Sequence, residues 1–239
     1  MSLVLSAATP TGAVLVADSA HVDVVSGMVS TGFAKVGAEA GALFGVAGVC
    51  DHNGFDVRNA IRHVLAARTP LDDVAHELMA QFGPDLLALY QAWARLPRPT
   101  EELPVVAQDC LSVVLAAPGL LVELWSVVGD GMFSLAGTSY LAEAHVRVRA
   151  CGTADGEVRA VTDDGREAAL ALALGERVPV RAVVRPPPPL GTSVGMLERE
   201  LREVVDGAVD RQGDLPRPSW LPPTAPLLAG PPQVVRLGS

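Results

Sequence analysis

The sequence predicts a layered α+β fold in which two antiparallel β-sheets carry helices on their outer faces. Short apolar strands dominate residues 2–47 and 110–151, whereas residues 51–94 and 194–211 show helical periodicity. Tight turns join several neighbouring strands, which favours antiparallel pairing because parallel strands need long crossovers. Helices outside two stacked sheets would bury both faces of each sheet.

The bulk composition fits one large domain. The chain has 239 residues, of which 49% are hydrophobic, and this supplies enough apolar surface for a sizeable core. We predict a single domain over residues 1–213, with the weakest pattern at 153–193. A Pro-rich, extended tail is expected over residues 214–239.

Charge and apolar runs exclude several classes of partner. The net charge is −9 and no basic stripe occurs, so nucleic acid is not an expected partner. No apolar run is long enough to span a membrane. No lysine or arginine precedes Lys35, so a secretory signal peptide is not expected either. The sequence therefore predicts a cytoplasmic protein without a membrane segment.

Cysteine and histidine spacing predicts neither a metal site nor a cofactor. The three cysteines, Cys50, Cys110 and Cys151, form no CxxC pair and are expected to be buried thiols in a reducing compartment. The histidines do not recur at the spacing of metal ligands; they are His21, His52, His63, His76 and His145.

The first half of the chain should begin with a hairpin. Strands at 2–8 and 13–17 flank the turn at Pro10-Thr11-Gly12, and the second strand ends at Asp18. The expected elements that follow in chain order are a loose strand at 22–30, a short strand at 33–37 that carries Lys35, a strand at 42–47, and helices at 51–67 and 71–94, the second kinked or split by Pro84.

The second half should add strands and one clear helix. Strands are expected at 110–117 and 120–128 around Pro118-Gly119, and then at 132–135, 145–151 and 157–162. A short helix at 166–174 and a polyproline segment at 186–189 should follow. The amphipathic helix at 194–211 has an exposed Glu198–Arg202 pair and these inward positions: Met196, Leu197, Leu201, Val204, Val205 and Ala208.

Two residues near the N-terminus stand out chemically. Lys35 is the only lysine among the 18 basic residues, and an ammonium, unlike a guanidinium, can take part in proton transfer. A compositional bias against lysine would explain the same count. Ser2 would become N-terminal on removal of Met1, and its α-amine could then act as the base for its own hydroxyl. Serine after methionine is common, so Ser2 carries weight only together with other residues.

The spacing of these residues resembles the proteasome β-subunit family and its bacterial relatives. That family has a nucleophile at its mature N-terminus and a hairpin similar to Gly12-Ala13-Val14-Leu15-Val16-Ala17-Asp18-Ser19. Its aspartate, lysine and Ala-Gly motif correspond to Asp18, Lys35 and Ala47-Gly48. The match covers roughly residues 2–152. The resemblance implies a four-layer αββα sandwich of the N-terminal-nucleophile (Ntn) hydrolase type.

The resemblance also implies a role for each matched residue. Ser2 would attack a carbonyl, and the Lys35 ammonium would favour the ionised form of the Ser2 hydroxyl. Asp18 would hold that ammonium, and the Gly48 N–H would stabilise the oxyanion. The family has a further serine near the N-terminus. Thr153 is its preferred counterpart here, and Thr192-Ser193 before the last helix is the alternative.

The expected function is amide-bond hydrolysis by a proteasome-like peptidase. The resemblance implies a peptide or other amide substrate and a homo-oligomer such as a ring. Ser2 stands where the family has threonine, and residues 153–193 have no clear counterpart. Two alternatives therefore stay open: an inactive scaffold or ring subunit, and a small-molecule amidase or acylase on the same fold.

Overall fold

The chain folds around two five-stranded antiparallel sheets. The computed structural model describes residues 2–22, 28–48, 50–52, 54–94, 109–128, 142–150, 158–162, 183–185, 193–214 and 223–238. Within these residues, no helix is long and apolar enough to cross a membrane.

The first sheet is built on the N-terminal hairpin. Every neighbouring pair in it is antiparallel, and Val4 lies opposite Ala17 in the hairpin register. Its strands, in spatial order, are β13 (Val183–Arg185), β12 (Val158–Thr162), β1 (Leu3–Thr9), β2 (Gly12–Ala17) and β14 (Gln233–Leu237).

The second sheet is a series of antiparallel neighbours formed by the middle of the chain. Its strands, in spatial order, are β11 (Ala142–Ala150), β10 (Leu120–Val128), β9 (Asp109–Ala117), β6 (Ala42–Gly48) and β5 (Val36–Glu39). Two short hairpins lie outside both sheets: β3 (His21–Val22) with β4 (Val29–Ser30), and β7 (Asp51–His52) with β8 (Phe55–Asp56).

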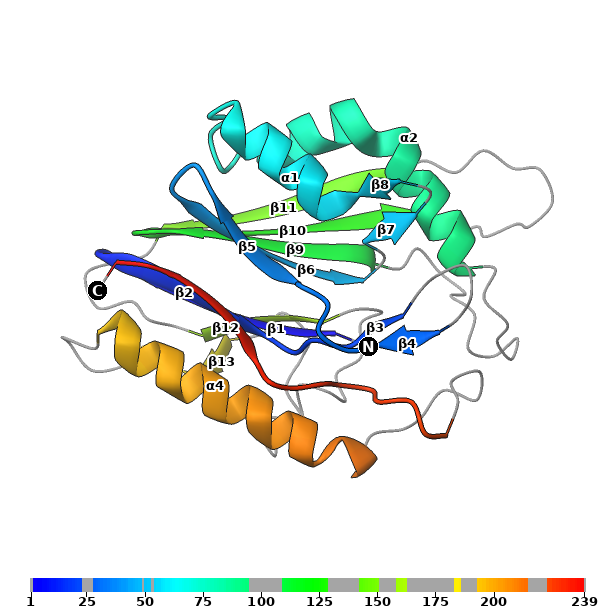
Figure 1. Ribbon diagram of the computed structural model, residues 1–239. Helices are drawn as coiled ribbons and strands as arrows, with labels where there is room; N and C mark the ends of the chain where they lie inside the picture. The colour runs from blue at the N-terminus through cyan, green and yellow to red at the C-terminus, as the bar shows by residue number, and fades with distance from the viewer. Residues whose placement is uncertain are drawn as a thin grey trace.

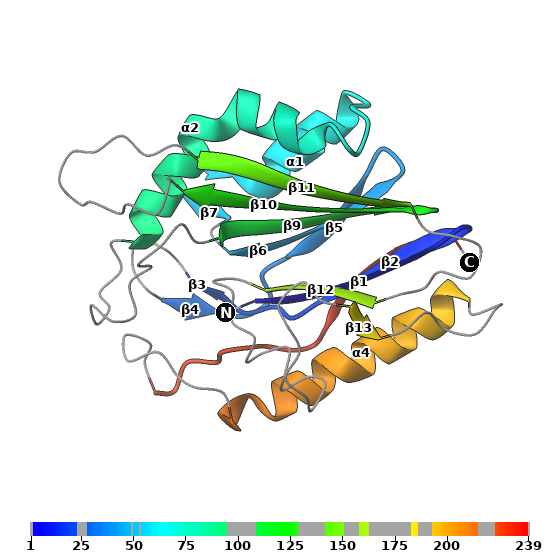
Figure 2. The same cartoon turned by 180° about the vertical axis from the view of Figure 1, so that it is seen from behind.

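Helices cover the outer faces of the two sheets (Figures 1 and 2). The helices α1 (Val57–Ala66) and α2 (Val74–Ala94) lie against the second sheet, and α4 (Val194–Asp210) lies against the first. The layers therefore run helix, sheet, sheet, helix. The predicted α+β architecture of two antiparallel sheets with helices outside is confirmed.

The apolar side chains form one cluster in each gap between layers. Strand β1 shows the arrangement most clearly, because Leu3, Leu5 and Ala7 face α4 whereas Val4 and Ala8 face the second sheet. All seven residues of β1 are buried, since both of its faces are covered. A strand buried on both faces reads as a continuous apolar run rather than an alternating one.

Close approach of the sheets depends on a small residue at Gly45. A Cβ placed there would lie 2.7 Å from Val4 Cγ1 and 3.0 Å from Leu15 Cδ2. Any side chain would therefore push the two sheets apart beside the N-terminal hairpin.

The end of the chain differs from the expected tail. Strand β14 forms the edge of the first sheet by pairing with β2, and Leu227 and Leu228 are buried against α4. A short 3₁₀ turn at Gln212–Asp214 follows α4. Proline and glycine at 216–232 suggested an extended tail, but the β-branched residues after them complete a sheet.

Some predicted details were wrong. Lys35 lies just before β5 rather than within a strand, α2 is not split at Pro84, and Met196 is 55% exposed. The Glu198–Arg202 pair is confirmed, with Arg202 Nη2 2.8 Å from Glu198 Oε1. The predicted elements at 132–135, 166–174 and 186–189 lie outside the described residues.

Candidate active site

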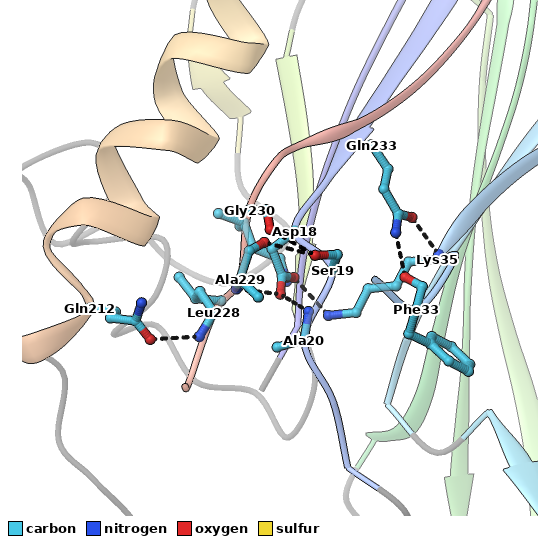
Figure 3. Close-up of polar contacts among 11 residues, drawn as sticks. Asp18, Ser19, Ala20, Phe33, Lys35, Gln212, Leu228, Ala229, Gly230 and Gln233 are labelled. Atoms are coloured by element: carbon cyan, nitrogen blue, oxygen red, sulfur yellow. Dashed lines mark hydrogen bonds and ion pairs between the residues drawn. The ribbon is translucent and has the colours of Figure 1, made fainter. Parts of the chain in front are cut away.

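Asp18 is the centre of a buried polar cluster at the end of β2 (Figure 3). Its side chain is fully buried. The N–H of Leu3 donates to Oδ1 at 2.8 Å, and the N–H groups of Ala20 and Ala229 donate to Oδ2 at 2.9 and 3.4 Å. Three backbone donors aimed at one carboxylate fix its position and satisfy its buried oxygens.

Lys35 supplies the cation for this carboxylate. Its Nζ lies 2.7 Å from Asp18 Oδ1, and its side chain is only 4% exposed. The Lys35 N–H donates to Gln233 Oε1 at 2.7 Å, and the Lys35 carbonyl accepts from Val46 N at 2.9 Å. The Gln233 amide also donates to the Phe33 carbonyl. The segment before β5 is thus fixed on both sides, which sets the direction of the ammonium (Figure 3).

Ser2 lies immediately beside this ion pair. It is 7% exposed and precedes Leu3, whose N–H donates to the same oxygen that accepts from Lys35. The Asp18 N–H in turn donates to the Leu3 carbonyl at 3.1 Å, which ties the start of β1 to the end of β2. The structure therefore brings Ser2, Asp18 and Lys35 into one neighbourhood.

Gly48 lies at the end of β6, in the sheet that faces the hairpin. Lys35 is bonded through its backbone to Val46, two residues before Gly48, so the glycine lies near the same end of the two sheets. Its φ is +101°, a conformation that favours glycine over residues with a Cβ.

Thr153 and the alternative pair Thr192-Ser193 were the candidates for a further hydroxyl near the N-terminus. Thr153 and Thr192 lie outside the described residues. Ser193 caps α4 by accepting from Met196 N, and the adjacent Val194 packs on Gly12. Gly12 starts β2 whereas Asp18 follows its end, so Ser193 lies at the opposite end of the hairpin from Ser2 and does not belong to the site.

Several residues that hold the site were missed from the sequence. The backbone of Ala229 accepts from Ser19 N at 2.8 Å and from Ser19 Oγ at 3.2 Å. Gln212 Oε1 accepts from the N–H groups of Leu227 and Leu228 at 2.8 and 3.2 Å. The strand-forming run after Gln233 was the one sequence signal that this segment joins a sheet. The Gln233 side chain bonds to Lys35 and Phe33, which lie 198 and 200 residues earlier in the chain.

An aromatic and cationic stack flanks this cluster. The His21 and Phe33 rings stack with centroids 3.8 Å apart and planes 9° from parallel. Arg58 Cζ lies 4.0 Å from the centroid of the Phe33 ring. Two groups this close to one centroid must occupy opposite faces of the ring. Arg58 is anchored in turn by its bonds to Asp56 and to the Ala34 carbonyl.

His21 also belongs to a cluster of potential metal ligands. Its Nε2 lies 3.0 Å from Asp51 Oδ1, and the donor atoms of His21, Cys50 and Asp51 all lie within 4.8 Å of one another. Burial raises the pKa of the Cys50 thiol to about 12, so this thiol is protonated at neutral pH and is not an activated nucleophile. Sequence spacing did not reveal the cluster, because strands β4, β5 and β6 lie between His21 and the other two residues.

Comparison with known proteins gives only distant likenesses. No protein-family model matches the sequence, and no curated protein matches it. Among solved structures, the chain is similar to eukaryotic HslV from Trypanosoma brucei, at 17% identity over 99% of both chains with a TM-score of 0.41. It is also similar to Anbu, an ancestral beta-subunit from Yersinia bercovieri, at 11% identity over 99% of this chain and 81% of that one, with a TM-score of 0.41. Because both TM-scores are below 0.5, the fold is defined by the chain's own layers and not by these likenesses.

Proposed function

We propose that this protein is an amide-bond hydrolase of the N-terminal-nucleophile type, a proteasome-like peptidase with Ser2 as nucleophile. The observation that carries the proposal is the buried Lys35–Asp18 ion pair beside Ser2. A buried ion pair is costly to desolvate and is weak evidence of stabilisation by itself. Its position next to a serine residue that removal of Met1 would make N-terminal gives the pair a chemical use in this proposal.

The proposed reaction begins when removal of Met1 frees the Ser2 α-amine. Ser2 Oγ bonds to the substrate carbonyl carbon while its proton passes to the α-amine, directly or through water. The scissile C–N bond then breaks, and the amine product leaves with that proton. Water next attacks the acyl ester, releases the carboxylic acid and restores the Ser2 hydroxyl.

The remaining residues support this step electrostatically. The Lys35 ammonium favours the developing alkoxide of Ser2, and Asp18 directs the ammonium through its 2.7 Å contact. The Gly48 N–H would donate to the oxyanion, where a preorganised donor is most effective. Absence of a side chain at Gly48 also lets a substrate backbone come close.

The test compares wild type, Ser2→Ala and Lys35→Arg in the turnover of fluorogenic peptides. Both variants should lose several orders of magnitude of activity, because groups that act as a unit are not additive. Arg202→Met, which changes the exposed pair with Glu198, is the matched control and should keep full turnover. Equal activity in all four proteins would refute the mechanism, and activity in none would favour an inactive scaffold.

Intact mass tests the nucleophile directly. The mature protein should lack Met1, and a β-lactone or epoxyketone probe should add to one residue, identified as Ser2 by peptide mapping. Quantitative retention of Met1 would exclude the free amine on which the reaction depends.

We also propose a homo-oligomer, on the basis of the sequence resemblance to ring-forming proteasome subunits. Light scattering at micromolar concentration should give a multiple of the 24.8 kDa chain mass. A monomeric mass under these conditions would contradict the assembly without affecting the chemistry proposed for Ser2.

A further inference from the structure

A second set of reactive side chains lies outside the Ser2–Asp18–Lys35 cluster. It consists of His21 from β3, Cys50 from the segment after β6, and Asp51 from β7, with donor atoms within 4.8 Å of one another. We propose that these three side chains bind a thiophilic divalent cation, with Zn²⁺ the preferred ion. This site does not depend on the proposed hydrolase activity.

The donor set selects the class of metal. A sulfur, an imidazole nitrogen and a carboxylate oxygen together suit Zn²⁺, whereas Mg²⁺ and Ca²⁺ prefer ligands that are all oxygen. Three protein ligands would leave a fourth tetrahedral position for water.

The spacing of the donor atoms fits a tetrahedral ion after a small contraction. Bonds of about 2.0–2.3 Å to zinc place ligand atoms about 3.3–3.8 Å apart in a tetrahedron. His21 Nε2 and Asp51 Oδ1 are already 3.0 Å apart, and the widest separation in the cluster does not exceed 4.8 Å. Metal binding would therefore shorten the widest separation between donor atoms by about 1 Å. Rotation of the Asp51 or Cys50 side chain can supply this change.

The surroundings hold the ligands in place. The His21 ring stacks on one face of Phe33, and Arg58 covers the other face. The plane of the His21 imidazole is therefore fixed before any ion binds. The Cys50 carbonyl accepts from Val57 N at 2.8 Å at the start of α1, which anchors the backbone of this ligand. Groups that orient a ligand in this way raise the affinity of a metal site.

Exposure and charge are also compatible with an ion. The Asp51 side chain is 39% exposed and that of His21 is 13% exposed, so the ion has a path from solvent. Binding converts the Cys50 thiol to a thiolate, whose proton passes to solvent, and involves no change in oxidation state. One thiolate and one carboxylate then balance the two positive charges of the metal.

The test uses the full chain, freed of metal with a chelator and titrated with Co²⁺, which reports its ligands spectroscopically. Wild type should bind one Co²⁺ per chain with an intense sulfur-to-cobalt charge-transfer band, and added Zn²⁺ should abolish the band by displacement. Cys50→Ser should lose the band, and Asp51→Asn should weaken Co²⁺ binding at least about 10-fold, the scale on which even outer-shell partners act. His63→Gln, an exposed change on α1, should behave as wild type.

Three results would overturn the proposal. The first is no charge-transfer band in wild type, and the second is a band that survives in Cys50→Ser, which would assign it to another cysteine. The third is unchanged affinity in Asp51→Asn, which is half-exposed and should fold normally. Circular dichroism of each variant confirms folding. Peptide turnover is not among the readouts, so failure of the hydrolase proposal and failure of the metal site are distinguishable.

Discussion

Replacing Lys35 by methionine tests how far the buried ion pair stabilises the fold. The change keeps a side chain of similar length but removes the ammonium 2.7 Å from a fully buried Asp18 carboxylate. Breaking one side of a buried pair typically costs about 3–5 kcal/mol, because the remaining charge is left buried. Asp18 keeps its bonds from Leu3, Ala20 and Ala229, which hold part of that charge. We therefore expect the lower end of the range, about 3 kcal/mol.

The measurement is urea unfolding followed by far-UV circular dichroism, with equal slopes required for the comparison. The matched control is Arg202→Met, because the Arg202 side chain is 47% exposed on α4 and Glu198 retains Arg236 as a partner. That exposed pair should contribute only about 0.3–0.5 kcal/mol. A loss below about 1 kcal/mol in Lys35→Met would refute the electrostatic reasoning.

A double-mutant cycle separates the pair from its surroundings. Asp18→Asn places an amide NH₂ toward backbone donors and so destabilises the protein by itself, by about 1–3 kcal/mol. Residues in direct contact typically show coupling of about 0.5–3 kcal/mol. The loss in the double variant should therefore be clearly smaller than the sum of the single losses, and strict additivity would show that the two groups do not interact.

Other changes around the site have equally definite outcomes. Gln233→Ala removes the acceptor of the Lys35 N–H and the donor to Phe33, and should cost about 1–3 kcal/mol in urea unfolding and lower turnover as Lys35 loses its position. Gly48→Ala forces a Cβ onto a φ of +101° and should cost about 1–2 kcal/mol and reduce turnover more than affinity; an active, fully stable variant would count against the oxyanion role. Cys50, with its pKa raised from 9.0 to about 12, should react with iodoacetamide far more slowly in the folded than in the urea-unfolded chain, as mapped by mass spectrometry. As pH rises, the Cys50 thiol ionises first in the unfolded chain, so its contribution to stability is complete below pH 9.0 and declines as pH approaches 12. Stability that rose over that interval would contradict the raised pKa.

The predictable part of the site depended on local patterns. The apolar run before Asp18 defines a hairpin whose end faces the start of the chain, so proximity of Asp18 to Ser2 follows from antiparallel register alone. The single lysine drew attention to Lys35, and the structure pairs it with Asp18. The layers were also accessible, since strands and helices have different hydrophobic periods.

The remainder depends on contacts between distant segments. The sequence around Gln233 does not indicate that its side-chain amide bonds to the backbone of Phe33 and Lys35. The Pro-rich segment before Gln233 is more typical of an extended tail. The proposed metal-ligand cluster likewise forms only when the segment at His21 meets the segment at Cys50 and Asp51 in the folded chain. Periodicity describes which face of an element is buried, but not which polar groups meet across the ends of layers.

The contacts of Asp18 also order events during protein synthesis. Lys35 leaves the ribosome 198 residues before Gln233, and Asp18 leaves it 211 residues before Ala229, so the groups that complete the polar cluster arrive much later than its centre. A nascent chain can therefore form much of its second sheet while the segment before β5 lacks the bonds that direct the ammonium. If Ser2 is a nucleophile, its full activation therefore waits until the segment from Ala229 to Gln233 has been made and has joined the first sheet.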